Sequence, residues 1–147
     1  MRIILNRQEA ELLIKNLFRS ELLEDEFMRA IDLFNSNEQE QSYNLLFNLW
    51  HDSQSPNRKV FYQGLLQASA ALQLLQKQKY CGARKVYSCA IRKLLPYASL
   101  TKPFNVKEFV HQMINYFENY DFEFGVENLD IKPMPRPKLS YVILSEA

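Results

Sequence analysis

Side chains able to carry out chemistry are few in this chain of 147 residues, and their spacing matches no catalytic motif. Its two histidines lie far apart, with His51 beside Asp52 at the end of an expected helix and His111 on the polar side of another. A metal centre needs several converging ligands, and a catalytic triad needs an oriented base. The sequence contains no phosphate-binding glycine loop and no HExxH, CxxC or GxSxG motif. We therefore expect no catalytic residue, no metal site and no cofactor, and we interpret His51 with Asp52 as a solvated helix end.

The two cysteines are expected to be free thiols. Cys81 and Cys89 are eight residues apart on one expected helix, about 12 Å along its axis, which is farther than a disulfide reaches. We interpret both as small packing residues and expect a reducing interior compartment, the cytoplasm. The N-terminal sequence agrees, because acidic residues follow too early for a signal or transit peptide.

Gln63 and Gln67 lie one turn apart on an otherwise apolar helix, so a buried amide at either position needs hydrogen-bond partners. One interpretation is a structural network with the backbone or with Tyr43 and Asn44. The alternative is a polar pocket for a small molecule between helices, formed by Tyr43, Asn44, Gln63 and Gln67. Gly64 suits either case, because a missing side chain lets another helix approach closely.

The net charge of +1 hides an uneven distribution, since residues 53–107 contain ten basic residues and no acidic one. The candidate surface for an anion or a partner consists of Lys77, Lys79, Arg84, Lys85, Arg92 and Lys93. Acidic flanks could neutralise this stretch within the fold, or it could bind an anionic partner. Tyr80 and Tyr87 interleave with the cations and could stack on bases, but no nucleic-acid-binding motif accompanies them and the pI is near 7.7.

The composition predicts an all-α fold, because 47% of the residues are hydrophobic and only three are glycine. Periodicity and capping signals predict a single bundle of about six helices, near residues 6–18, 20–34, 38–51, 60–76, 83–96 and 105–117. The helix at 60–76 is apolar on nearly every side and should be central, with a turn at 80–82 after it. We expect the bundle to span residues 1–131 and an extended Pro-rich tail to span 132–147, in which 140–144 could pair with residues 2–5.

Two further expectations concern the environment of the chain. No run of about 18 uncharged apolar residues is present, so we expect no membrane span. Aromatic residues gather near the end of the last expected helix, at Tyr116, Tyr120, Phe122 and Phe124. They exceed what one small bundle covers, which favours a homodimer.

A set of short motifs resembles a known family. These motifs are Phe34-Asn35, Leu49-Trp50, Phe61-Tyr62-Gln63-Gly64, Leu66-Gln67, Ala70-Ala71-Leu72, Gly82-Ala83 and Ile91 through Leu95 with Tyr97. In order and spacing they resemble the domain of unknown function 309 family over about residues 27–97. The resemblance implies a small all-helical bundle of bacteria and plastids with no assigned biochemical role. The Pro-rich tail is similar to cyanobacterial and plastid versions, which implies the plastid stroma if the chain is plastid-encoded.

The chain departs from that family at the positions that could carry chemistry. Ahead of the tryptophan the family usually has a Glu, then a His-Glu pair, then another Glu. Counted from Trp50, these positions hold Gln41, Tyr43, Asn44 and Phe47 here. None of these side chains is a carboxylate or imidazole ligand, and none titrates near neutral pH.

We therefore predict a non-enzymatic helical protein that acts as a protein–protein interaction module, with an unidentified protein partner. An exposed face or the Pro-rich tail would form the docking surface. Nucleic-acid binding, to RNA, through the basic region 58–107 is the alternative. Small-molecule binding near Gln63 and Gln67 is a second alternative.

Overall fold

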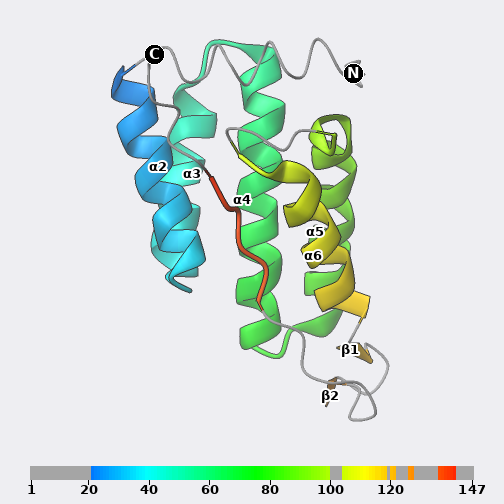
Figure 1. The fold of residues 1–147 in the computed structure, drawn as a ribbon. Coiled ribbons are helices and arrows are strands. Elements are labelled where there is room, and N and C mark those ends of the chain that lie inside the picture. Colours follow the sequence, from blue (N-terminus) through cyan, green and yellow to red (C-terminus); the bar gives the residue numbers. More distant parts are fainter. Residues whose placement is uncertain (1–20, 100–103, 119, 122–125, 128–135, 142–147) are drawn as a thin grey trace.

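The protein is an all-α bundle, which confirms the predicted fold class (Figure 1). The computed structural model describes residues 21–99, 104–118, 120–121, 126–127 and 136–141, so the helix expected at 6–18 lies outside the described residues. The elements are α2 (Glu21–Asn35), α3 (Gln39–Asp52), α4 (Pro56–Gln76), α5 (Tyr80–Leu94), the 3-10 turn η1 (Leu95–Tyr97), α6 (Val106–Glu118), β1 (Tyr120–Asp121) and β2 (Val126–Glu127). The two short strands pair antiparallel, with Tyr120 opposite Glu127.

Helix α4 lies at the centre of the bundle and packs against α3 and α5. It begins four residues before the expected start at Val60, because Ser55 caps its N-terminus and Pro56 occupies its first position. The Ser55 hydroxyl oxygen accepts the backbone N–H of Arg58 at 3.4 Å, and the fixed φ of proline suits a first helical turn. Its buried side chains are Phe61, Tyr62, Leu65, Leu66, Ala68, Ser69, Ala71, Leu72 and Leu75.

The turns that follow α2 and α4 share one geometry. Asn37 and Gln78 both adopt left-handed backbone conformations, with φ of 64° and 61°. The next residue in each turn donates its N–H to a carbonyl five residues back, as in a Schellman motif. The chain therefore turns at 77–79, and the predicted turn at 80–82 is wrong because those residues open α5. The prediction placed the turn at Gly82 because glycine favours turns, but Asn37 and Gln78 make the two turns with left-handed backbone conformations.

Three polar side chains are buried where α2, α3 and α4 meet. The Ser42 hydroxyl donates to the Ala30 carbonyl at 2.9 Å, and the Gln39 amide donates to the Phe34 carbonyl at 3.1 Å. The Ser69 hydroxyl on α4 lies 3.0 Å from both oxygens of Gln39, the backbone carbonyl and Oε1. Because each buried polar group has a partner, the cluster fixes how the three helices sit against one another.

Helix α6 matches the prediction at its N-terminus and along its buried face. The sequence predicts a capping box of Asn105 with Glu108, and its first half is present, because the Asn105 side-chain oxygen accepts the backbone N–H of Glu108 at 3.0 Å. The second half is not formed, because the N–H of Asn105 donates to the Ser140 carbonyl. The buried face consists of Val106, Phe109, Val110, Met113 and Phe117. This regular spacing is what places α6 on the bundle.

Residues 136–141 of the Pro-rich tail are extended and contact both α2 and α6 (red in Figure 1). The Asn35 amide holds Leu139 from both sides, donating to its carbonyl at 3.0 Å and accepting its N–H at 2.9 Å. On α6, Gln112 Oε1 accepts the N–H of Lys138 at 2.9 Å. Leu139 and Pro137 are buried, so this part of the tail belongs to the core.

The end of this segment is fixed by its neighbours at the start of α6. Asn105 donates its N–H to the Ser140 carbonyl at 2.8 Å, and Phe104 forms an antiparallel bridge with Tyr141. The Tyr141 hydroxyl donates to Asp32 Oδ1 at 2.7 Å. Tyr141 therefore pairs with Phe104. The predicted pairing of 140–144 with 2–5 falls on residues 2–5 and 142–144, which lie outside the described residues.

Candidate interaction surfaces and pocket

The outer side of α3 carries a row of aromatic rings that we call the aromatic stripe, made of Tyr43, Phe47, Trp50 and His51. Phe47 stacks on Tyr43 with ring centroids 6.3 Å apart and on His51 at 6.1 Å, because residues four apart share a helix face. Trp50 lies 5.4 Å from Phe47, and the Lys59 ammonium sits 5.6 Å from the Trp50 ring centre. Phe47 is 38% exposed, so the stripe presents apolar surface to solvent.

The predicted basic surface, which we call the basic face, lies on α5 and on the turn before it. Lys77, Lys79, Arg84, Lys85 and Arg92 are exposed, and Lys93 is half-buried. Lys93 donates its ammonium to Gln67 Oε1 at 2.9 Å. Within the described part of the chain, no acidic side chain forms an ion pair with Lys77, Lys79, Lys85 or Arg92. The sequence left open whether acidic flanks neutralise these cations or an anionic partner binds them. Among the described residues, no acidic side chain neutralises these four cations.

The rings of Tyr80 and Tyr87, near the basic face, are less accessible for stacking on bases than the sequence suggests. The Tyr87 ring stacks on Phe117 with centroids 4.2 Å apart and planes 8° apart, which covers one side of the ring. Burial raises the pKa of the Tyr87 hydroxyl, and the nearby charge of Glu118 adds to that effect. Tyr80 is half-buried. A nucleic acid on this face would depend on phosphate contacts more than on stacking against Tyr87.

The residues of the predicted polar pocket are divided between two helices. Gln63 and Gln67 on α4 are half-buried, and Gln67 is bonded to Lys93 on α5. On α3, Tyr43 belongs to the aromatic stripe and Asn44 is exposed. None of the four lines the pocket at the junction of α3 and α4. The prediction of a small-molecule site at these residues therefore gains no support from that pocket.

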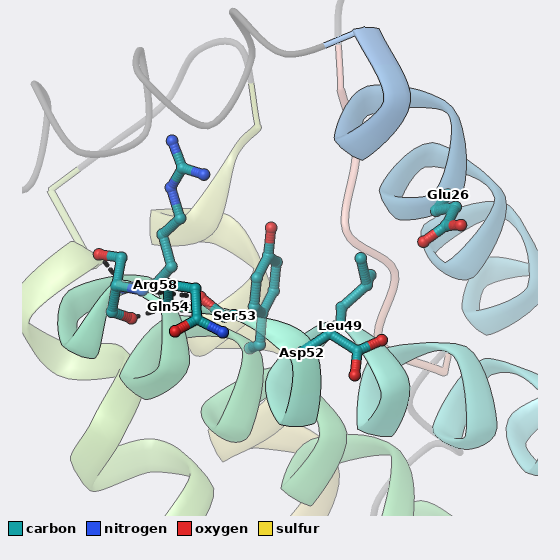
Figure 2. A pocket seen from close by; sticks show the side chains of 8 residues that line it. Glu26, Leu49, Asp52, Ser53, Gln54 and Arg58 are labelled. Carbon is teal, nitrogen blue, oxygen red and sulfur yellow. Dashed lines mark hydrogen bonds between the residues drawn. The ribbon is translucent and has the colours of Figure 1, made fainter.

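A pocket of about 480 Å³ lies where α3 ends and α4 begins (Figure 2). Its polar lining consists of Glu26 on α2, of Asp52, Ser53, Gln54 and Ser55 at the junction, and of Arg58 and Tyr62 on α4. Burial raises the pKa of Tyr62 to about 12, while the charge of Arg58 lowers it and that of Glu26 raises it. Sequence reasoning missed this pocket, because its residues come from three segments with no common spacing.

The remaining candidates for chemistry are on the surface. His51 Nδ1 lies 3.1 Å from Asp52 Oδ1, and both side chains are largely exposed, as expected of a solvated helix end. Cys89 is half-buried and Cys81 is exposed, so Cys81 is not the packing residue that we expected. No group of three or more His, Cys, Asp or Glu side chains gathers as metal ligands among the described residues. The described helices include none with the length and apolar character needed to cross a membrane.

The fold defines the class of protein as a small all-α helical bundle. Residues 27–86 match the family model described as Domain of unknown function (DUF309). This match supports the family resemblance found in the sequence motifs. The match ends before Ile91 to Leu95 and Tyr97, which the motif resemblance includes. No curated protein and no solved structure matches the chain.

Proposed function

We propose that this protein is a protein-interaction module that docks an apolar segment of a protein partner on the aromatic stripe of α3. The observation that carries this proposal is Phe47, which is 38% exposed while its ring contacts Tyr43, Trp50 and His51. Aromatic side chains are enriched at interface hot spots, where they bury a large area for little loss of rotamer freedom. Rings that already pack against one another lose still less on binding.

The stripe also supplies the polar features of a typical interface. Lys59 beside Trp50 and His51 at the end of the stripe surround the apolar centre with groups that hydrogen bond or carry charge. An apolar centre with a polar rim is the usual anatomy of a protein–protein interface. The partner expected here has an apolar side chain that covers Phe47 and an acidic group near Lys59.

Photo-crosslinking tests the proposal at single positions. A photoreactive phenylalanine placed at Phe47 of the full chain in the native cell should give one defined protein adduct. The same probe at Leu95, which is 54% exposed on a different element, is the matched control and should give none. In a pull-down, Phe47→Ser should lower recovery of that partner about tenfold or more, as expected for a central aromatic contact. Leu95→Ser should leave it unchanged. Equal adducts at both positions, or full recovery by Phe47→Ser, would contradict the proposal.

The basic face supports a second candidate function, which is RNA binding. The observation in its favour is that Lys77, Lys79, Lys85 and Arg92 are exposed and have no ion-pair partner among the described residues. Such binding should weaken steeply with salt. In a plot of log affinity against log salt concentration, Lys85→Glu with Arg92→Glu should reduce the slope by about one for each phosphate that is no longer neutralised. Filter binding of a single-stranded RNA at several salt concentrations measures this slope. Salt-insensitive binding would exclude this candidate.

A further inference from the structure

The aromatic stripe of α3 has a spacing that is symmetric about Phe47. Tyr43 lies four residues before Phe47 and His51 four residues after it, and both rings stack on Phe47, with centroids 6.3 Å and 6.1 Å from it. When two copies of such a helix pack antiparallel about a two-fold axis at Phe47, residues equally far before and after this position face each other. Tyr43 of one copy then faces His51 of the other. The order of rings in the stripe is therefore complementary to itself.

The two ends of the stripe carry opposite charges. Glu40 is exposed and lies seven residues before Phe47, which places it on the same helix face two turns away. Within the described part of the chain, no basic side chain forms an ion pair with Glu40. At the other end, Lys59 is half-buried and its ammonium lies 5.6 Å from the centre of the Trp50 ring. The antiparallel arrangement brings Glu40 of each copy toward Lys59 of the other.

A second copy supplies both groups that the stripe requires of a partner, an apolar side chain for Phe47 and a carboxylate for Lys59. It also brings the N-terminal end of one α3 dipole near the C-terminal end of the other, which is favourable. Asp52 lies near the same end as Lys59 and opposes the approach of Glu40. Its effect is reduced when His51 is protonated, because His51 Nδ1 lies 3.1 Å from Asp52 Oδ1.

We propose that the aromatic stripe of one copy packs antiparallel on the stripe of a second copy and forms a homodimer with its two-fold axis at Phe47. This inference rests on the proposed function, because it names the partner that covers Phe47. One helix face from each copy gives an interface at the low end of the size range, below about 1,200 Å². The dimer should therefore be in reversible equilibrium with the monomer.

Sedimentation velocity of the purified full chain over a wide range of protein concentrations measures this equilibrium. Phe47→Ser should raise the Kd of the dimer about tenfold or more, as expected for a central aromatic contact. Leu95→Ser, which also removes an exposed apolar side chain, is the control and should leave the Kd unchanged. A photoreactive phenylalanine at Phe47 of the purified chain should give an adduct between two copies that maps to α3 in both.

Charge exchange tests the antiparallel orientation. Glu40→Lys and Lys59→Glu each place like charges together at both ends of the interface, so each alone should raise the Kd about fivefold or more at low salt. The double variant restores two opposite pairs and should return the Kd to within about twofold of the wild type. Lys107→Glu makes the same charge change at an exposed position on α6 and should dimerise as the wild type does.

Three results would overturn the inference: a chain that stays monomeric at every concentration, a dimer that Phe47→Ser does not weaken, or a double variant that is not restored. The proposed function is tested separately. A monomeric chain whose probe at Phe47 captures a different protein in the native cell would keep the stripe as a docking surface and would reject only the second copy as its partner.

Discussion

The contact between α4 and α5 depends on a missing side chain at Gly64. A Cβ atom added there would lie 2.8 Å from Leu94 Cδ2, 2.9 Å from Leu94 Cγ and 3.3 Å from Lys93 Cβ. Leu94 is fully buried, so its branch point has no free space into which to move. Gly64→Ala would gain about 1 kcal/mol of helix propensity but would incur about 2–3 kcal/mol of overpacking, the upper part of the usual range, because two Leu94 atoms would lie closer than 3.0 Å. We expect a net loss of about 1–2 kcal/mol in the free energy of unfolding.

Gly82 provides a matched control on the facing helix. A Cβ there would meet only Leu74 Cδ1, at 3.6 Å, which is an ordinary contact. Gly82→Ala should therefore stabilise the protein by about 0.5–1 kcal/mol through helix propensity alone. Urea unfolding followed by circular dichroism measures both variants, and their effects should have opposite signs.

A double-mutant cycle identifies the cause of the loss at Gly64. Leu94→Ala alone should cost about 2–5 kcal/mol, because Leu94 is fully buried. In the Gly64→Ala background it should cost about 1–3 kcal/mol less, because the new methyl group occupies the space that Leu94 left. If Gly64→Ala is as stable as the wild type, or if the two substitutions are additive, the close contact does not limit the packing of α4 on α5.

Three other outcomes follow from the described contacts. Burial raises the pKa of Tyr62 to about 12 in the folded protein from about 10 in the unfolded chain, so ionisation of Tyr62 favours the unfolded chain only above pH 10. As pH rises from 10 to 12 it should lower the free energy of unfolding by about 2–3 kcal/mol, in addition to the loss caused by Tyr97, whose pKa burial also raises. Urea unfolding across this pH range should therefore show a smaller fall in Tyr62→Phe than in the wild type. Ser69→Ala leaves Gln39 Oε1 buried without its hydroxyl donor, so thermal unfolding should show a loss of about 1–3 kcal/mol, whereas the exposed Ser88→Ala should change stability little. Asn35→Ala removes both hydrogen bonds to the backbone of Leu139 and should cost about 2–4 kcal/mol, with faster hydrogen exchange at the Leu139 amide as the specific sign.

The main helices could be predicted from the sequence because their patterns are local. Helix α4 is recognisable from its apolar residues on all sides, and α6 from the Asn105 cap and its regular apolar face. The error at the start of α4 came from Ser55 and Pro56, which are loop-forming residues in one context and a helix cap in another. The error at 80–82 came from assigning the turn to glycine when Gln78 adopts the left-handed conformation.

The buried polar residues and the pocket could not be predicted, because they depend on contacts between distant segments. Gln39 is the first residue of α3, where a polar side chain normally faces solvent, and only Ser69 and the Phe34 carbonyl make its burial favourable. The pocket combines Glu26 with Tyr62, which no local pattern connects. The aromatic stripe did have a local signal in the spacing of Tyr43, Phe47 and His51. The leucines of α3 already account for its apolar face, so this spacing alone does not indicate a second, exposed apolar surface.

The double hydrogen bond between Asn35 and Leu139 also has a kinetic consequence. The two residues are 104 positions apart, so closing this contact orders a long loop and is expected late in folding, after the local helix pairs have formed. Interactions absent from the folding transition state act mainly on the rate of unfolding. Contacts of residues 136–141 should therefore lower the unfolding rate of the bundle without raising its folding rate. Because the segment is synthesised after every helix described, the bundle assembles first and acquires this kinetic protection last.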